Sequence, residues 1–253
     1  MNVKNRLFPL VTVLLVFVAW YIAAAVYKIE LILPKPTTAF KELWSAFGES
    51  AFWKGVGNTL LRSVMAFSVA FVAALVLSLV SVGSETFFRL FYPLVVILRA
   101  LPTISVIFIC YIAVKGWYRA VLISFLVIFP TLYSSFYTAF KQCSGSLSEV
   151  GKVYKVKKRY VLSRFIIPSV WASMYSDIVN TLSLTVKLII AAEAVTATGF
   201  SLGGLMAESK AIVDMGRILA YTIVAIGLSY LTELVIRLTA RIIKEVSVKW
   251  RFH

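Results

Sequence analysis

The sequence E-V-G-K-V-Y-K-V-K-K-R-Y-V-L-S-R-F-I-I-P, residues 149–168, is a polar, basic segment between two long apolar ones. It holds six lysines and arginines. The apolar segments on either side are long enough to cross a lipid bilayer. A segment this charged between two such spans lies in water beside the membrane, so the sequence predicts a membrane protein with an exposed basic loop.

The remainder of the chain has the composition of a membrane protein. Hydrophobic residues make up 60% of it and charged residues only 15%, far from the balance of a soluble domain. Apolar runs of about 20 residues are expected to be helices, because an open strand leaves backbone groups unsatisfied in lipid. We expect an all-α, polytopic fold forming one transmembrane domain over residues 1–253, with about six spans. The predicted spans are Leu7–Val26, Thr59–Val82, Phe91–Val114, Tyr118–Phe140, Val170–Ala194 and Gly216–Ala240.

The net charge of +15 is distributed unevenly between the predicted loops. If both termini face the cytoplasm, the inner segments hold 15 lysines and arginines against three acidic residues, and the outer segments hold eight against five. Cytoplasmic loops of membrane proteins carry an excess of basic residues, so this orientation is favoured. Binding of nucleic acid is the alternative explanation of the charge.

The N-terminus and the reactive residue types limit the function classes. Lys4, Arg6 and the alanines at 23–25 also fit a cleavable signal peptide, although the apolar stretch is longer than a usual signal core. Cys110 and Cys143 imply no disulfide framework. The single histidine, His253, argues against histidine metal clusters and Ser-His catalysis, and the chain carries no phosphate-binding loop. We therefore expect no catalytic site, metal or cofactor in this chain.

The longest outer segment is residues 27–58. Pro34 and Pro36 bias the residues before them away from helix, so the chain is extended there. Thr37 and Thr38 are expected to cap a short helix that lies along the outer membrane interface. The apolar side of that helix carries Phe40, Leu43, Trp44 and Phe47. Contact with a solute-binding partner is the alternative role. A second outer element, Thr196–Met206, is glycine-rich and predicts a loop or short re-entrant segment.

The inner segment 141–168 predicts a short helix that projects into the cytoplasm. Gln142–Leu147 is expected to form the turn into it, and Glu149 lies near the expected helix start, where the dipole favours an acid. Pro168 ends the segment as the next span begins. Such a helix fits a groove on a soluble partner, and the alternative is a solvated basic loop. Its candidate contact residues, at helical spacing, are Val150, Val153 and Tyr154.

This inner segment resembles the cytoplasmic EAA loop of bacterial ABC importer permeases, a pattern of E-A-A, three residues, G, nine residues and I-x-L-P. Glu149-Val150-Gly151 occupies the E-A-A position, Lys155 falls where the glycine belongs, and Phe165–Pro168 closes the pattern. Gly151 and Lys155 are the departures from it. The resemblance implies that Glu149, Val150, Gly151, Val153, Tyr154, Lys155 and Pro168 couple the chain to an ATPase subunit.

Other stretches are similar to the taurine, alkanesulfonate and nitrate permease group. These are L-P-K-P-T-T-A-F at residues 33–40, N-T-L-L-R-S-V at 58–64, L-R-A-L-P at 98–102 and A-A-E-A-V-T-A-T-G-F-S-L-G-G-L at 191–205. The resemblance implies a homodimeric permease in the bacterial cytoplasmic (inner) membrane, with two ATPase subunits inside that bind ATP and Mg²⁺ and a solute-binding protein outside. The group's substrates are small and mostly anionic, and some relatives carry vitamin precursors. A gradient-driven transporter or channel is the alternative function.

Six ionisable residues fall within the predicted spans. They are Arg62, Arg99, Asp177, Lys187, Glu193 and Glu233. Each costs about 2.5–3.5 kcal/mol at the bilayer centre on insertion scales, so they are expected to face protein or water. Arg99 lies at a depth similar to Asp177 and Glu233. We expect it to pair with one of these two acids, fixing helix packing or an inner gate.

The fifth predicted span carries a polar stripe at helical spacing, made of Ser173, Asp177, Asn180, Leu184 and Lys187. Such a stripe lines a cavity or a helix interface. Lys187 is about 15 Å along the helix from Asp177, too far for a direct bond, so an anionic solute is its expected partner. Snorkelling or pairing with a neighbouring helix is the alternative. Glu193 lies near the outer mouth, as a gate or as the cap of a span end.

Overall fold

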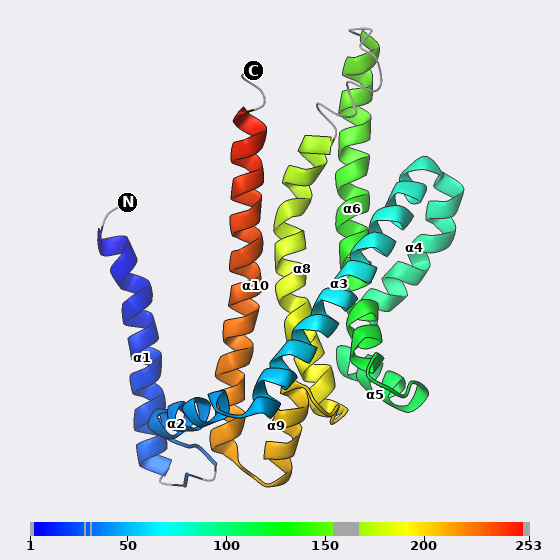
Figure 1. Ribbon diagram of the computed structural model, residues 1–253. Coiled ribbons are helices and arrows are strands. Elements are labelled where there is room, and N and C mark those ends of the chain that lie inside the picture. The colour runs from blue at the N-terminus through cyan, green and yellow to red at the C-terminus, as the bar shows by residue number, and fades with distance from the viewer. Residues whose placement is uncertain (1–2, 28, 31, 154–166, 250–253) are drawn as a thin grey trace. The chain divides into compact units, whose positions relative to one another are not determined.

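The computed structural model describes residues 3–27, 29–30, 32–153 and 167–249, and these residues are helical with short connections (Figure 1). No strand occurs among them. The elements are α1 (Val3–Tyr27), α2 (Pro36–Phe47), α3 (Ser50–Gly83), α4 (Glu85–Ala100), α5 (Thr103–Ala113), α6 (Arg119–Val153), α8 (Ile167–Val195), α9 (Leu202–Ala211) and α10 (Met215–Lys249). The predicted all-α fold class is confirmed.

The chain divides into two compact units. The first contains Met1–Asn58 and Glu193–Ile226, and the second contains Thr59–Ala192 and Gly227–His253. Each is described by itself below.

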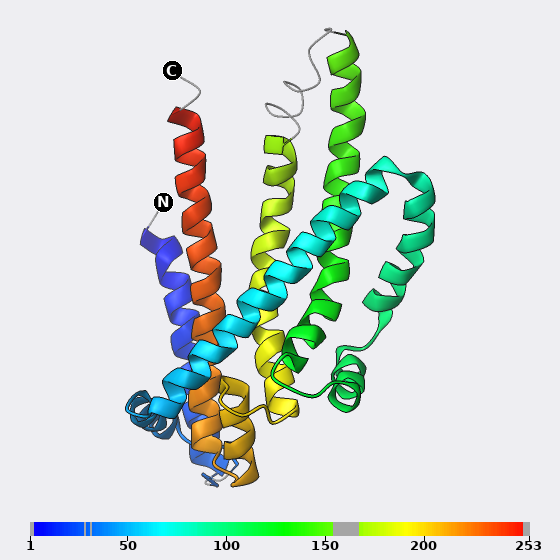
Figure 2. The ribbon, with the colours of Figure 1, turned by 45° about the vertical axis from the view of Figure 1, so that its right-hand side comes forward.

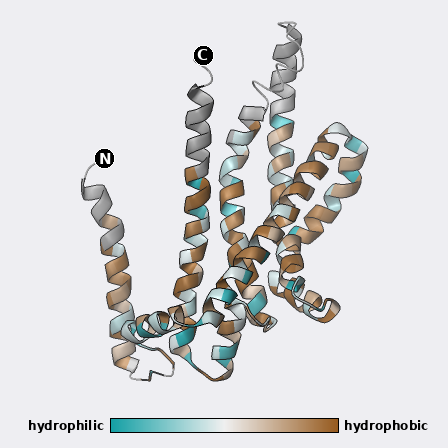
Figure 3. Ribbon diagram, viewed as in Figure 1, coloured by the Kyte–Doolittle hydropathy of each residue, from teal (hydrophilic) through white to brown (hydrophobic). Residues whose placement is uncertain are grey.

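Among the described residues, four helices are long and apolar enough to cross a membrane. They are Ser50–Gly83, Arg119–Gln142, Ser173–Val195 and Met215–Leu238, and the bent pair α4 and α5 makes a fifth if it counts as one span. In α1, the described apolar part is the shorter Val11–Val26. Figure 3 shows hydrophobic residues along most of α3, the most apolar of the candidates. The described residues therefore form a polytopic helical membrane protein.

The predicted span Phe91–Val114 is wrong as a continuous helix. It is divided at Leu101 and Pro102, and the axes of α4 and α5 differ by 99° (Figure 2). The residue before a proline is disfavoured in the helical region. Leu101 accordingly has φ −67° and ψ 128°, outside the helical region, and Pro102 is the N-cap residue of α5. An apolar window does not detect this break, because both halves are hydrophobic.

The core of the second unit contains small residues at four-residue spacing on α3. Ala66, Ala70 and Ala74 are all fully buried there. Small side chains at this spacing let neighbouring helices approach closely. Ser81, farther along the same helix, shares a hydrogen bond of 2.6 Å with the Tyr133 hydroxyl of α6. Hence α3 and α6 are held together by close packing and by one buried polar contact.

A ladder of aromatic rings joins α4 to α6. Neighbouring rings along α6 lie 5.4–6.2 Å apart. Across to α4, Phe91 lies 5.4 Å from Tyr133, and Phe88 stacks on Tyr137 at 4.4 Å. Aromatic pairs at such distances add about 0.5–1.5 kcal/mol each beyond burial, so α4 is firmly attached to α6. The ladder consists of Phe125, Phe129, Tyr133 and Tyr137 on α6 with Phe88 and Phe91 on α4.

The inner end of α6 differs from the expectation. Gln142–Leu147 does not form a turn, because α6 continues through it as one helix to Val153. The connection between α3 and α4 is the single residue Ser84, whose hydroxyl caps α4 by accepting from the Phe87 amide. Gly116 lies in the connection between α5 and α6, where its φ of 106° favours glycine.

In the first unit, α2 begins differently from the prediction. Lys35 and Pro36 start the helix, and neither Thr37 nor Thr38 caps it with its side chain. Proline suits this first turn, because its missing N–H has no partner there anyway. Phe40, Trp44 and Phe47 are exposed, as an interfacial helix requires. The ring of Phe40 also stacks on Phe17 of α1 at 6.0 Å.

Candidate translocation and coupling site

One face of α8 is exposed in the second unit. Its residues, spaced three or four apart, are Ser173, Asp177, Asn180, Leu184, Lys187 and Ala191, which we call the α8 stripe. Between them, Met174, Ile178 and Ile189 are buried. The predicted polar stripe therefore forms an exposed face of a helix whose opposite side is packed. Two of its members carry charge in a candidate membrane span, so the face requires a polar neighbour or water.

The intramembrane charges do not pair as expected. Arg99 forms no ion pair with Asp177 or Glu233 in the described structure. Its Nη1 donates to the Ser134 hydroxyl at 3.3 Å. Asp177 accepts a short hydrogen bond from the Ser135 hydroxyl. Glu233 instead pairs with Arg237, one turn along α10, at 2.5 Å.

The physical reason is that α6 supplies two hydroxyls at this position. Arg99 and Asp177 are bound to consecutive residues of α6, which point about 100° apart around a helix. The Ser134 hydroxyl also donates to the Pro130 carbonyl at 2.9 Å, so its lone pair is turned to the guanidinium. Equal depth in the membrane does not determine the rotation of a helix, and the rotation decides which polar groups meet.

Lys187 is the second charge of the α8 stripe. Its side chain is exposed, and no described carboxylate forms an ion pair with it. Arg62, the charge predicted within α3, is by contrast buried, at 5% exposure. Solute contact at the exposed Lys187 stays a prediction.

The described residues that the resemblance assigns to coupling lie on two helices. Glu149, Val150, Gly151 and Val153 occupy the inner end of α6, and Pro168 is the second residue of α8. Tyr154 and Lys155 lie outside the described residues, as does most of the basic segment. The position expected for Glu149 is wrong: it lies in the last described turns of a long helix and not near a helix start. The dipole argument for an acid at this position therefore fails.

Glu193, which the sequence predicts to lie near the outer mouth, belongs to the first unit. Its side chain is fully buried, and its Oε2 accepts from the Gly203 amide at 3.4 Å. Its carbonyl accepts from the Thr198 amide at 3.0 Å. An acid at the N-terminus of α9 is favoured by the helix dipole. Glu193 thus stabilises the connection from α8 to α9 from inside.

The backbone of the connection between α8 and α9 explains why this stretch is rich in glycine. The chain passes through left-handed backbone at Ala197 and Phe200, and Ser201 then caps α9 by accepting from the Gly204 amide at 2.9 Å. A Cβ on Gly204 would lie 2.1 Å from the Thr198 carbonyl oxygen. The glycine-rich pattern predicted at 196–206 is therefore a tight cap followed by a short helix.

With this geometry established, one comparison decides the family. The model of the family described as "Binding-protein-dependent transport system inner membrane component" matches residues 81–245, well over half of the chain. The chain belongs to this family. It is therefore the permease subunit of a binding-protein-dependent ABC transporter and a multi-pass membrane protein. No curated protein matches the chain at a significant level of similarity.

The family match covers every residue that the sequence predicts for coupling or for the pathway. It begins at the end of α3 and extends into α10, so it includes Arg99, the α8 stripe and the inner end of α6. The predicted ABC importer permease is thus confirmed, whereas the taurine and nitrate group stays a prediction. Among the described residues, no three or more His, Cys, Asp and Glu side chains gather as a metal site.

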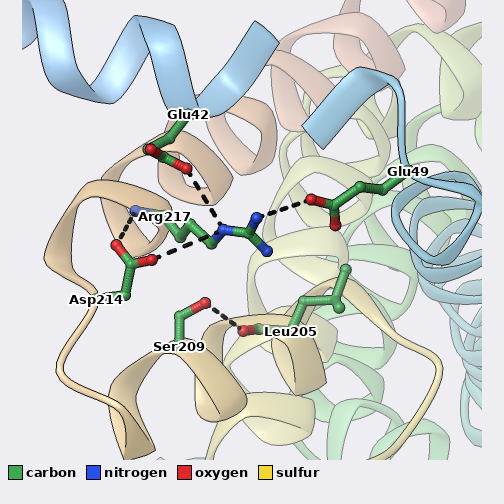
Figure 4. Close-up of polar contacts among 6 residues, drawn as sticks. All are labelled: Glu42, Glu49, Leu205, Ser209, Asp214 and Arg217. Carbon is green, nitrogen blue, oxygen red and sulfur yellow. Dashed lines mark hydrogen bonds and ion pairs between the residues drawn. The ribbon is translucent and has the colours of Figure 1, made fainter. Parts of the chain in front are cut away.

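An ionic cluster in the first unit of the permease was missed by sequence reasoning (Figure 4). The Arg217 guanidinium lies 2.8 Å from Glu49, 3.4 Å from Glu42 and 3.7 Å from Asp214. Asp214 also accepts from the Arg217 amide at 3.0 Å, which caps the start of α10. The cluster ties α2 and the connection between α2 and α3 to the start of α10. Only Asp214, three residues before Arg217, gave a local signal; the other two acids are about 170 residues away in sequence.

Proposed function

We propose that the chain is the permease subunit of an ATP-driven importer for a small anionic solute, such as a sulfonate, nitrate or a vitamin precursor. Two copies form the pathway in the bacterial cytoplasmic membrane, with both termini of each inside. An ATPase dimer binds ATP and Mg²⁺ on the cytoplasmic side, and a solute-binding protein delivers the solute outside. The family match, the charge of the loops and the α8 stripe support this arrangement.

The α8 stripe is the observation that carries the proposal. A charge facing lipid costs about 2.5–3.5 kcal/mol at the bilayer centre, and this face presents both Asp177 and Lys187. A second copy of the chain, placed against the same face, would cover these charges and enclose a polar pathway between two α8 helices. A two-fold arrangement of this kind is the commonest among homo-oligomers.

The sign of the solute is argued from Lys187. The ammonium is exposed and forms no ion pair with a described carboxylate, while Asp177 of the same stripe is already bound by Ser135. In a homodimer the two Lys187 side chains face a common pathway and repel each other, which an anion between them relieves. The pathway therefore favours a negatively charged solute.

Energy enters through α6. The helix runs without a break from the membrane span to Glu149–Val153, which we propose contacts the ATPase. Closure of the ATPase dimer around ATP would pull this end and move the membrane part of the same helix.

The test is purification of the tagged permease from its native membranes. An ATPase subunit is expected to co-purify with the permease and to be lost when residues 149–159 are deleted. The control variant Thr138→Ala, at an exposed position of α6, is expected to retain the ATPase. Reconstituted with that ATPase and the binding protein, the permease is expected to take up labelled sulfonate or nitrate only with ATP. Uphill uptake by the permease alone on an ion gradient would refute the proposal.

A further inference from the structure

Two consecutive serines connect the coupling helix to the pathway. Ser134 and Ser135 lie in the membrane part of α6, and both are half-buried. Ser135 donates to the carboxylate of Asp177 on the α8 stripe, and Ser134 accepts from Arg99 at the end of α4. No family motif that we recognised in the sequence includes either serine.

We infer that Ser135, with Ser134, is a positioning residue that transmits movement of α6 to the α8 stripe and to the end of α4. The inference rests on the proposed function, since it assumes an ATPase that moves the inner end of α6. Its new content is that the hydrogen bond between Ser135 and Asp177, and not the packing of α6 alone, makes the pathway follow the coupling end.

One continuous helix, α6, joins its coupling end to the two serines. Glu149 and Ser135 are fourteen residues apart on the same helix, about 21 Å at 1.5 Å per residue. Pro130 is the proline inside α6, and it lies beyond the serines as seen from the coupling end. The segment between the coupling residues and the serines is one continuous helix without a proline, so a displacement of the coupling end is carried along it toward the serines.

A neutral hydroxyl bound to a carboxylate is a charge-assisted hydrogen bond, about twice as strong as one between neutral groups. This bond holds Asp177, a member of the α8 stripe. The neighbouring buried residues of α8, Met174 and Ile178, are apolar and form no hydrogen bond through their side chains. A displacement of α6 is therefore transmitted to the stripe most directly through Asp177.

The aromatic ladder attaches α4 to α6 up to Phe91, but Arg99 lies two turns farther along, next to the break at Leu101. There the contact with Ser134 adds a polar attachment to the packing of Val95 and Leu98 in the core that includes α6. The Ser134 hydroxyl donates a hydrogen bond to the Pro130 carbonyl, which leaves its lone pair toward the guanidinium. A movement of α6 is therefore transmitted to α8 through Ser135 and to the end of α4 through Ser134.

The experiment uses the complete transporter, purified with its ATPase and reconstituted in nanodiscs, and it needs no identified solute. Cys110 and Cys143 are replaced by alanine, and Ala191→Cys on the α8 stripe reports exposure to a hydrophilic maleimide. The labelling rate is measured without nucleotide and with vanadate-trapped Mg-ADP. In this parent protein the two rates are expected to differ several-fold.

Ser135→Ala is expected to reduce that nucleotide-dependent difference at least threefold, with the amount of bound ATPase unchanged. Ser135→Thr, which retains the hydroxyl, should restore the difference. Thr138→Ala, an exposed hydroxyl one turn away on the same helix, should leave it intact. If Ser135→Ala lowers assembly, Asp177→Ala breaks the same bond from the other side and has to give the same loss of response.

The outcomes separate the two proposals. A full nucleotide response in Ser135→Ala, or in Asp177→Ala where the first variant does not assemble, overturns the inference and leaves the proposed function standing. An equal loss in Thr138→Ala also overturns it, because the effect would then belong to the helix in general. A parent protein with bound ATPase but no nucleotide response overturns the proposed function, and the inference with it.

Discussion

Gly204→Ala is expected to destabilise the α8–α9 connection, although alanine is normally the better helix residue. The added Cβ would lie 2.1 Å from the Thr198 carbonyl oxygen and 3.0 Å from the Ser201 hydroxyl oxygen. The first distance is well below van der Waals contact, so the backbone has to move by about 1 Å. Overpacking of this kind costs about 1–3 kcal/mol.

Two further contributions determine the net value. The displaced Ser201 hydroxyl loses its cap on the Gly204 amide, a contact of 2.9 Å whose removal costs about 1 kcal/mol. Alanine returns about 1 kcal/mol through its helix propensity. The gain and the lost cap roughly cancel, which leaves a local destabilisation of about 1–3 kcal/mol.

The matched control is the same substitution at Gly227, in α10. There the added Cβ meets no described atom within 4 Å, so only the gain in helix propensity remains. Amide hydrogen exchange followed by mass spectrometry in detergent measures both sites locally. Gly204→Ala should speed exchange in peptides covering residues 196–209 by about fivefold to 100-fold, and Gly227→Ala should not speed it. Unchanged protection in Gly204→Ala would refute the reasoning, since it would mean that Thr198 does not lie against Gly204.

Three other substitutions test separate parts of the structure. Arg217→Gln leaves three acidic side chains, each about one-third exposed, without their shared cation, and is expected to lower local stability by about 1–2 kcal/mol, measured as faster amide exchange in α2. Arg89→Gln, which removes the cation of an exposed ion pair, should lower stability by less than about 0.5 kcal/mol. Pro102→Ala restores a backbone N–H at the α4–α5 break and should add helix signal in circular dichroism. Lys187→Gln should lower anion uptake at least tenfold, whereas Lys187→Arg should retain it; equal uptake by Lys187→Gln would exclude the solute contact.

The spans, their helical form and the polar stripe could be predicted from the sequence, because each depends on a local pattern. Apolar length reports where a helix crosses the bilayer, and three- or four-residue spacing reports which side of α8 is polar. The break at Leu101 was readable in principle from Pro102, but a hydropathy window averages across it. Local backbone chemistry has to be weighed against such a window before a span is accepted.

The pairing of charges could not be predicted, because it depends on how helices are rotated and on which neutral groups lie between them. Depth in the membrane places Arg99 near Asp177 but does not reveal the two serines that bind them separately. The Arg217 cluster could not be predicted for a related reason, since Glu42 and Glu49 contact Arg217 only through the tertiary fold. Charge counts along a loop assign such residues to a side of the membrane and nothing more.

The continuous α6 changes how the departure at Gly151 should be understood. In a separate short helix, a glycine near the first turn would alter only the entry into that helix. In α6, Gly151 lies two residues before Val153, at the end of a 35-residue helix, and glycine there weakens the helix by about 1 kcal/mol relative to alanine. The aromatic ladder and the serine contacts all lie on the other side of this weak point. Movement of the coupling end can therefore be partly absorbed at Gly151, and Gly151→Ala should stiffen the connection and increase the labelling response of Ala191→Cys.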